Sequence, residues 1–260
     1  MGREVRASDF TEEFTEEFAA AAQWFAQHLA HASMDAPVAA CPDWTVLDLA
    51  VHLGNVHSWA ASVLETGRAA EELDDRPSSS RPRRVARWYE GRAEDLYAVL
   101  RATPLDRPCW NFSYGEGVAG FWHRRQTHET VVHGLDLAAA AEVSERLPAA
   151  LAADGVDEVL AVFLHRMHSR GHPASLDTPL ALRATDTGHE WTVSPGPPGE
   201  EPRVMRSEAA GDDLLEAPAG MLLKLLWKRA RLDEPAVRAQ VRVCGDDARV
   251  RRFLASRLTA

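Results

Sequence analysis

The first half of the chain shows the apolar periodicity of amphipathic helices. The first predicted helix has its apolar positions at Phe10, Phe14, Phe18, Phe25 and Leu29. Three further helices are expected at 45–67, 83–102 and 120–143. The connections between the last three helices are long and polar, which is typical of a four-helix bundle with crossover loops.

The pattern changes after Pro148, where short runs of β-forming residues alternate with helical segments. Strands are expected at 180–185, 190–193, 204–208 and 237–243, and helices at 149–168, 218–231 and 246–258. Such a mixture predicts a small α+β domain. We therefore predict an α+β protein of two domains, a four-helix bundle over 1–147 and a small α+β domain over 148–260.

Metal-binding side chains occupy the second and fourth predicted helices. His52 lies on the apolar stripe of the second helix, together with Leu49 and Val56. Glu129 and His133 are four residues apart in the fourth helix, so they lie within about 40° of each other on one face. Facing helices of a bundle build metal sites in this way. Two histidines and one carboxylate suit zinc with one coordination position left open.

Each of these residues also has an ordinary structural explanation. A core histidine is more often a hydrogen-bonded structural residue, since burying an unpaired polar group costs about 1–3 kcal/mol. Glu129 and His133 could also form a solvated pair on a helix surface. The residues alone leave the metal site and the structural explanation open.

Composition narrows the class of protein. The 260 residues are 45% apolar and 26% charged, as in folded globular proteins, and the net charge of −10 argues against nucleic-acid binding. No stretch offers the about 20 mainly apolar residues of a membrane span. Three separated cysteines and the lack of a signal peptide lead us to expect a cytoplasmic protein. Of the 29 basic residues only Lys224 and Lys228 are lysines, which indicates a GC-rich genome.

Two segments jointly resemble a known family. The segment CPDWTVLDLAVHLGNVHSW contains Trp44 and His52, and RRQTHETVVHGLDLA contains Glu129, His133 and Asp136. They resemble the maleylpyruvate isomerase family of mycothiol-dependent enzymes, within the DinB-like superfamily. In the second half, GMLLKLLWKR followed by VRVCGDDARVRRFL is similar to the C-terminal domain of that family.

The resemblance implies a divalent metal, usually zinc, held by His52, Glu129 and His133 in a DinB-like bundle. It also implies mycothiol, a thiol of high-GC actinobacteria, as cofactor. Zinc coordination lowers the pKa of a thiol and supplies thiolate at neutral pH. In an isomerase the thiolate adds to a cis double bond, the new single bond rotates, and elimination leaves the trans isomer. In an S-transferase the thiol stays attached to the electrophile, and the same metal site serves both reactions.

Further residues have expected roles. An anionic substrate would need arginines to hold its carboxylates, and the candidates are Arg125, one turn before Glu129, and Arg229, which matches a family arginine. Asp136 is expected to orient His133. Lys228 stands where relatives often carry glycine, so the substrate could differ from maleylpyruvate.

The expected partners are a small thiol and a small, anionic electrophile, meeting in a cleft between the two domains. A hypothesis of another class is a metal-binding regulatory or structural module without turnover. A fourth protein ligand, from His57 or His128, would favour that module, whereas an open position would favour the enzyme.

Overall fold

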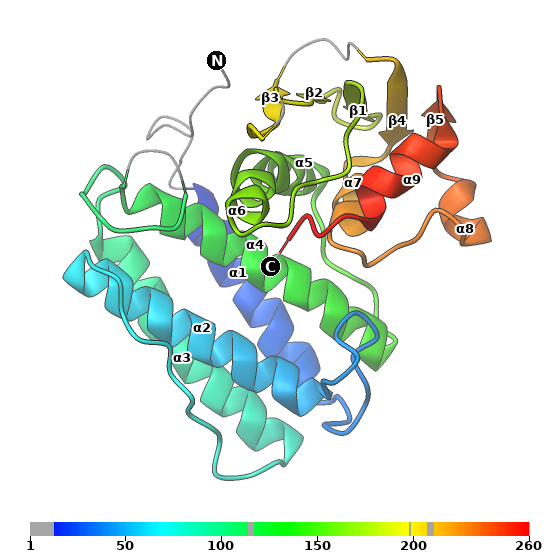
Figure 1. Cartoon of the computed structure of the whole chain (residues 1–260). Helices are drawn as coiled ribbons and strands as arrows, with labels where there is room; N and C mark the ends of the chain where they lie inside the picture. Colours follow the sequence, from blue (N-terminus) through cyan, green and yellow to red (C-terminus); the bar gives the residue numbers. More distant parts are fainter. Residues whose placement is uncertain (1–12, 114–116, 198, 207–210, 260) are drawn as a thin grey trace. The chain divides into compact units, whose positions relative to one another are not determined.

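The chain folds into two compact units that divide between Arg146 and Leu147. The computed structural model describes residues 13–113, 117–197, 199–206 and 211–259 (Figure 1). Phe10 of the predicted first helix lies outside these residues. No helix in the described part of the chain is long and apolar enough to cross a membrane.

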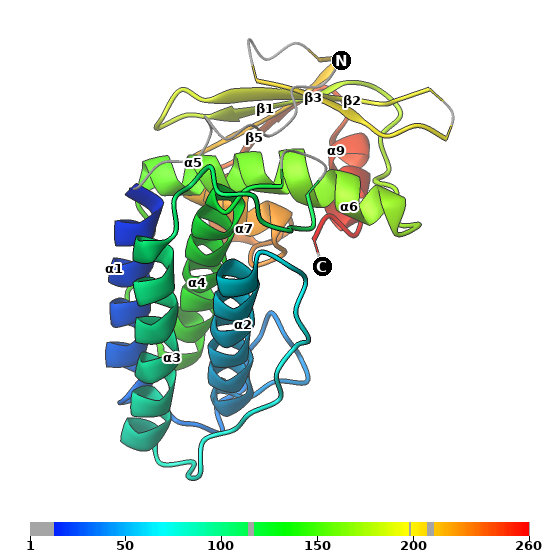
Figure 2. The same cartoon turned by 90° about the vertical axis from the view of Figure 1, so that its left-hand side faces the viewer.

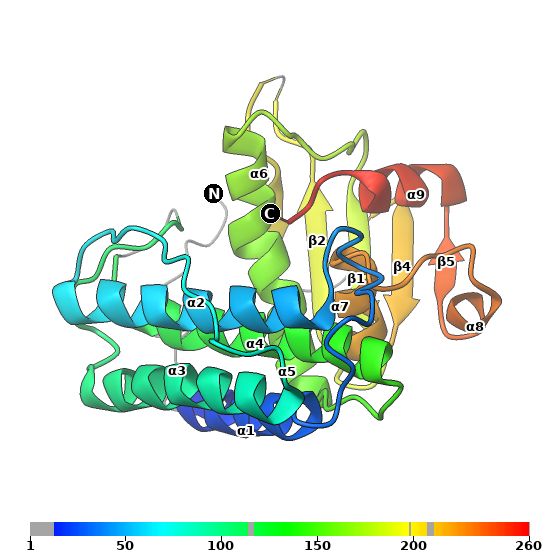
Figure 3. The ribbon, with the colours of Figure 1, turned by 90° about the horizontal axis from the view of Figure 1, so that it is seen from below.

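The first unit is the predicted helical bundle. Its helices are α1 (Glu13–Leu29), α2 (Val46–Thr66), α3 (Pro82–Ala102) and α4 (Gly120–Ala141). Helix α1 packs against α3 and α4, and α2 packs against the same two helices, so the four close around one core (Figures 2 and 3). Phe18, Phe25 and Leu29 are fully buried in it. The periodicity of the sequence therefore predicted this unit well.

Local sequence signals set the position of α2. Thr45 is the N-cap, with its hydroxyl accepting from the backbone N–H of Asp48 and the Asp48 carboxylate accepting from the backbone N–H of Thr45. This reciprocal pair satisfies N–H groups that a helix start leaves unpaired. Gly67 ends the helix at φ 69°, a conformation that glycine adopts without steric cost. The two ends fix which residues of α2 face the core and which face outward.

The second unit places helices on one face of a mixed sheet (Figure 2). The helices are α5 (Ala149–Glu158), the π-helical turn η2 (Val159–Phe163), α6 (Leu164–Ser169), α7 (Ala219–Leu226), the short α8 (Pro235–Arg238) and α9 (Asp247–Ala255). The strands are β1 (Leu180–Ala184), β2 (Glu190–Ser194), β3 (Arg203–Met205), β4 (Asp213–Ala217) and β5 (Arg242–Cys244). Their spatial order is β3-β2-β1-β4-β5, and only the β1–β4 pair is parallel among the described strands. The predicted α+β class is confirmed.

The sequence prediction was wrong at three places in this unit. The strand predicted over 237–243 begins only at Arg242, because Pro235 starts a helical turn that continues to Arg238. Strand β4 was not predicted, because its sequence DLLEA contains two acidic residues, which are depleted from strands. The helix predicted to reach residue 231 already ends at Leu226.

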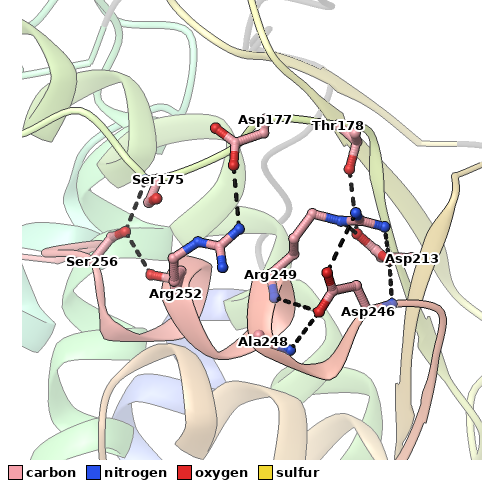
Figure 4. A network of polar contacts seen from close by, with 9 residues as sticks. All are labelled: Ser175, Asp177, Thr178, Asp213, Asp246, Ala248, Arg249, Arg252 and Ser256. Atoms are coloured by element: carbon pink, nitrogen blue, oxygen red, sulfur yellow. Dashed lines mark hydrogen bonds and ion pairs between the residues drawn. The ribbon is translucent and has the colours of Figure 1, made fainter.

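A buried carboxylate holds β4 to α9. Asp213 accepts from the Arg249 guanidinium at 2.6 and 2.9 Å, from the Asp246 backbone N–H at 2.7 Å and from the Thr178 hydroxyl at 3.3 Å (Figure 4). Asp246 is in turn the N-cap of α9. These contacts explain why an acidic residue can begin a central strand, since its charge is fully paired.

Candidate metal centre

Three metal-binding side chains converge between α2 and α4. His52 Nε2 lies 3.3 Å from Glu129 Oε1, and His133 Nε2 lies 3.2 Å from the same oxygen. One ligand atom from each of the three residues lies within 4.8 Å of the others. The His133 side chain is 9% exposed and that of His52 is 35% exposed. The cluster is therefore closed on the α4 side and open beside His52.

The spacing of these atoms suits a tetrahedral metal ion. Zinc lies about 2.0–2.1 Å from histidine nitrogens and carboxylate oxygens, so two ligands at corners of a tetrahedron are about 3.3–3.4 Å apart. The two nitrogen–oxygen distances of 3.2 and 3.3 Å come close to that value. Both distances from Glu129 thus match a tetrahedral zinc site, and the two histidine nitrogens lie within 4.8 Å of each other. The three side chains leave one position of such a site for another ligand.

Two neighbouring side chains orient these groups. Asp136 Oδ2 accepts from His133 Nδ1 at 2.9 Å, which turns the Nε2 atom of His133 toward Glu129. Arg125 donates to Glu129 Oε2 at 2.7 Å from the preceding turn of α4. Arg125 and Asp136 are both buried. Each metal-binding group on α4 is thus held from the side opposite to the cluster.

The electrostatic environment of the cluster favours the charged forms of Glu129 and His133. Burial acts to raise the pKa of Glu129, but Arg125 and the two histidines outweigh it and hold that pKa well below its usual range. Burial alone would lower the pKa of His133, whereas its hydrogen bonds with Asp136 and Glu129 raise it to about 9. Glu129 is therefore ionised at neutral pH, the form in which a carboxylate binds a metal.

His57, on the same helix as His52, is buried and has a structural role. Its Nδ1 contacts Gln126 Oε1 at 2.9 Å and its Nε2 contacts the Tyr89 hydroxyl at 3.3 Å. Complete burial lowers the pKa of His57 to about 4, so the ring is neutral. His128 packs edge-on against Phe14 of α1. Neither histidine belongs to the three-residue group found among the described residues.

A groove continues from the open side of the cluster. Its volume is about 510 Å³, and residues of α2, the segment 43–44 and the segment 72–76 line it. We call it the α2 groove. Trp44 is one of the lining residues, and its ring centroid lies 4.7 Å from that of His52 and 6.0 Å from that of His133. A ligand that reaches the cluster from His52 would pass along this groove.

Hydrogen bonds fasten the outer wall of the α2 groove to the helix. The Asn55 side chain donates to the Asp75 backbone oxygen at 3.0 Å and accepts from the Asp75 backbone N–H at 3.2 Å. Trp59 Nε1 donates to the Ala70 backbone oxygen at 2.9 Å. The sequence does not predict this wall, because the polar segment 68–81 has no periodicity that indicates its position.

The remaining predicted residues lie elsewhere. Arg229 belongs to the second unit, where its guanidinium donates to the Trp227 backbone oxygen at 2.7 Å and lies 5.5 Å from the centre of the Trp227 ring. Its predicted contact with substrate stays a prediction. Lys228 has φ 60°, so it occupies a left-handed position that favours glycine.

Comparisons with known proteins bear on the bundle and on the fold. Residues 14–138 match the family model described as the mycothiol maleylpyruvate isomerase N-terminal domain. The bundle belongs to that family. The resemblance read from the two motifs is thus confirmed, and the family is named for an enzyme. The matched residues include all three members of the cluster.

Solved structures extend the likeness of fold beyond the family domain. A crystal structure of the mycothiol-dependent maleylpyruvate isomerase matches 92% of this chain and 95% of its own, with a TM-score of 0.60 and 12% identity. A histidine-to-alanine mutant of that enzyme matches 85% and 90%, with a TM-score of 0.56 and 12% identity. At this identity the likeness concerns the fold alone. No curated protein sequence matches the chain significantly.

Proposed function

We propose that the chain is a zinc-dependent enzyme that activates mycothiol as a thiolate for attack on a small electrophile. The convergence of His52, Glu129 and His133, with one side open, is the observation that carries the proposal. The match of the bundle to the mycothiol maleylpyruvate isomerase N-terminal domain supports mycothiol as the thiol.

The donor set defines what the site would hold. Two imidazole nitrogens and one carboxylate oxygen form a typical ligand set of catalytic zinc, which keeps a position for a further ligand. When bound, zinc would supply a positive charge that lowers the pKa of the mycothiol thiol. Other divalent metals bind the same set, so the metal's identity is part of the proposal.

The surrounding residues prepare the site for an anionic sulfur. Asp136 holds the imidazole of His133 by its Nδ1, and Arg125 holds the far oxygen of Glu129. His133 and Glu129 therefore do not have to reorient when a ligand enters. Trp44 packs beside the rings of His52 and His133 and provides an apolar surface next to them.

The open side favours an enzyme over a structural metal module. A structural zinc site has four protein ligands, whereas the group found among the described residues has three. His57, one of the two histidines considered as a fourth ligand, already contacts Gln126 and Tyr89. The half-exposed His52 adjoins a groove large enough for a small molecule.

Two reactions follow from a thiolate at this position. In the isomerase reaction the sulfur adds to one carbon of a cis double bond and leaves after the bond has rotated, so the thiol is regenerated. In S-transfer the carbon–sulfur bond persists and a leaving group departs, or a proton is added, so the thiol is consumed. Consumption of mycothiol per turnover distinguishes the two reactions.

Ultraviolet thiolate absorbance tests the proposal directly. Zinc-loaded protein is titrated with mycothiol as a function of pH, using wild type, His52→Ala and the control His31→Ala, an exposed histidine at the end of α1. We expect bound mycothiol to ionise below neutral pH in the wild type and the control, and no such shift in His52→Ala. An unchanged ionisation of mycothiol in all three proteins would overturn the proposal.

A second assay follows maleylpyruvate and mycothiol together by nuclear magnetic resonance. Formation of fumarylpyruvate at constant mycothiol would assign the isomerase reaction. Loss of mycothiol to an adduct with this or another electrophile would assign S-transfer.

A further inference from the structure

The α2 groove has a charge that bears on the substrate. Its lining contains four carboxylates and one arginine, which leaves three net negative charges. The four acidic residues are Asp43, Asp48, Glu72 and Asp74. The hydrogen bonds from Thr45 hold the pKa of Asp48 below its usual range, so this carboxylate stays ionised. An anion entering the groove would meet a repulsive potential.

The cations near the groove already face carboxylates. Arg76, the one arginine or lysine among the described lining residues, lies 3.7 Å from Asp48 and 3.9 Å from Asp74. Arg125, beside the cluster, lies 2.7 Å from Glu129. A substrate carboxylate would have to compete with these contacts, so Arg76 and Arg125 offer it little compensation for losing water.

The other features of the groove suit uncharged and cationic groups. Trp44 and Trp59 both line it, and an indole face attracts both apolar groups and cations. Asn55 and Trp59 hold its outer wall in place through Asp75 and Ala70. The groove is therefore a preformed acidic and aromatic passage that ends at His52.

From this lining we propose that the α2 groove selects an uncharged or cationic electrophile and disfavours a dianionic one. This inference rests on the proposed thiolate function and departs from the expectation of an anionic substrate. It favours S-transfer to a neutral or positively charged electrophile over isomerisation of a diacid.

The test uses three bromoacetyl electrophiles that share one reacting carbon. They are bromoacetate, which is anionic, bromoacetamide, which is neutral, and bromoacetylcholine, which is cationic. In each reaction the thiolate forms a carbon–sulfur bond, the carbon–bromine bond breaks, and bromide leaves with the electron pair. Each rate is divided by the uncatalysed rate of mycothiol with the same electrophile, so that intrinsic reactivity cancels.

Reversing two charges of the groove lining isolates the role of the groove. Glu72 and Asp74 are exposed, so Glu72→Lys/Asp74→Lys, which we call the rim variant, should leave the fold intact. The matched control is Glu65→Lys/Asp106→Lys, which changes the same charge at exposed positions outside the groove. In the wild type we expect the corrected kcat/KM to rise from anion to neutral to cation.

The rim variant should raise the ratio of anion to cation kcat/KM by about three- to tenfold at low salt, and less at high salt. The control should leave that ratio within about twofold of the wild type. Zinc- and His52-dependent turnover with an unchanged ratio in the rim variant would overturn this inference while leaving the proposed function in place. No zinc-dependent turnover with any of the three electrophiles, while bound mycothiol still ionises below neutral pH, would overturn this inference alone. Loss of that ionisation as well would overturn both.

Discussion

Glu129 in the bundle and Asp213 in the second unit are both carboxylates with basic neighbours. The Asp213 side chain is only 3% exposed. Its oxygens accept hydrogen bonds from Arg249, from the Asp246 backbone and from Thr178, and each of these groups acts as a donor in the contact. Glu129 is 16% exposed, and its Oε1 faces the Nε2 atoms of His52 and His133. Those nitrogens can each release a proton and bind a metal.

The difference lies in what the neighbours of each carboxylate can do. Around Asp213 every contact joins two parts of the second unit, namely β4 with α9 and with the segment before β1 (Figure 4). Around Glu129 three potential ligand atoms crowd together beside an open groove. A carboxylate surrounded by fixed donors stabilises a fold, whereas one that shares its space with other metal ligands indicates a binding site.

Loss of the Asp213 carboxylate should have the largest effect on stability. Asp213→Ala removes the buried acceptor of the Asp246 N–H and of the Arg249 guanidinium, which is partly exposed and keeps the Asp246 carboxylate, so we expect the second unit to lose about 1–3 kcal/mol. Urea unfolding followed by tryptophan fluorescence measures this, with Asp212→Asn, an exposed neighbour, as the control. Zinc content should not change; if Asp213→Ala lost zinc in its folded state, the two carboxylates would not be separate in function.

The same carboxylate should make stability depend on pH. The Arg249 hydrogen bond and the Asp246 N–H lower the pKa of Asp213 from its ordinary value to about 2. Its contribution is therefore complete above about pH 4 and is lost as the pH falls toward 2. Thermal unfolding between pH 5 and 2 should show a steeper loss in the wild type than in Asp213→Ala. Parallel curves would mean that Asp213 has an ordinary pKa in the folded protein.

Asp136→Asn should weaken metal binding while leaving the fold largely unchanged. An amide can still contact His133 Nδ1 but lacks the negative charge that makes the imidazole a stronger ligand. We expect zinc affinity to fall about ten- to hundredfold, measured by competition with a chromophoric chelator. Unchanged zinc affinity in a folded variant would assign Asp136 to structure alone.

Lys228→Gly should have the smallest effect of these substitutions, and it should increase stability. Lys228 has φ 60° and follows α7, with its N–H bonded to the Leu225 oxygen and the Arg229 N–H bonded to the Lys224 oxygen. Glycine adopts this helix-ending conformation without strain, so stability should rise by about 1 kcal/mol. Lys228→Ala is the control, because it removes the Nζ contact with the Ala255 oxygen but keeps the strain. A less stable glycine variant would show that this contact outweighs the strain.

The sequence predicted the bundle and its three candidate ligands for identifiable reasons. Helical periodicity located α1 to α4, and the four-residue spacing placed Glu129 and His133 on one face. The same spacing also relates Arg125 to Glu129, so the ion pair between them was available from the sequence although Arg125 was assigned to substrate.

Other features could not be predicted because they depend on contacts between distant segments. The acidic strand β4 is stabilised by Arg249, 36 residues away in sequence. The outer wall of the α2 groove depends on one side chain, Asn55, that pairs with the backbone of Asp75. No local pattern marks either contact, since each polar residue would also be acceptable at an exposed position.

Metal content and mycothiol affinity should be measured together on wild type and His52→Ala, because both are expected to depend on the three-residue cluster. Protein purified without chelator is examined by elemental analysis and then titrated with mycothiol by calorimetry. We expect one equivalent of zinc and measurable thiol affinity in the wild type, with both lost in a folded His52→Ala variant. A wild-type protein that neither contains zinc nor takes it up, or a His52→Ala variant that binds zinc and mycothiol as the wild type does, would contradict this expectation.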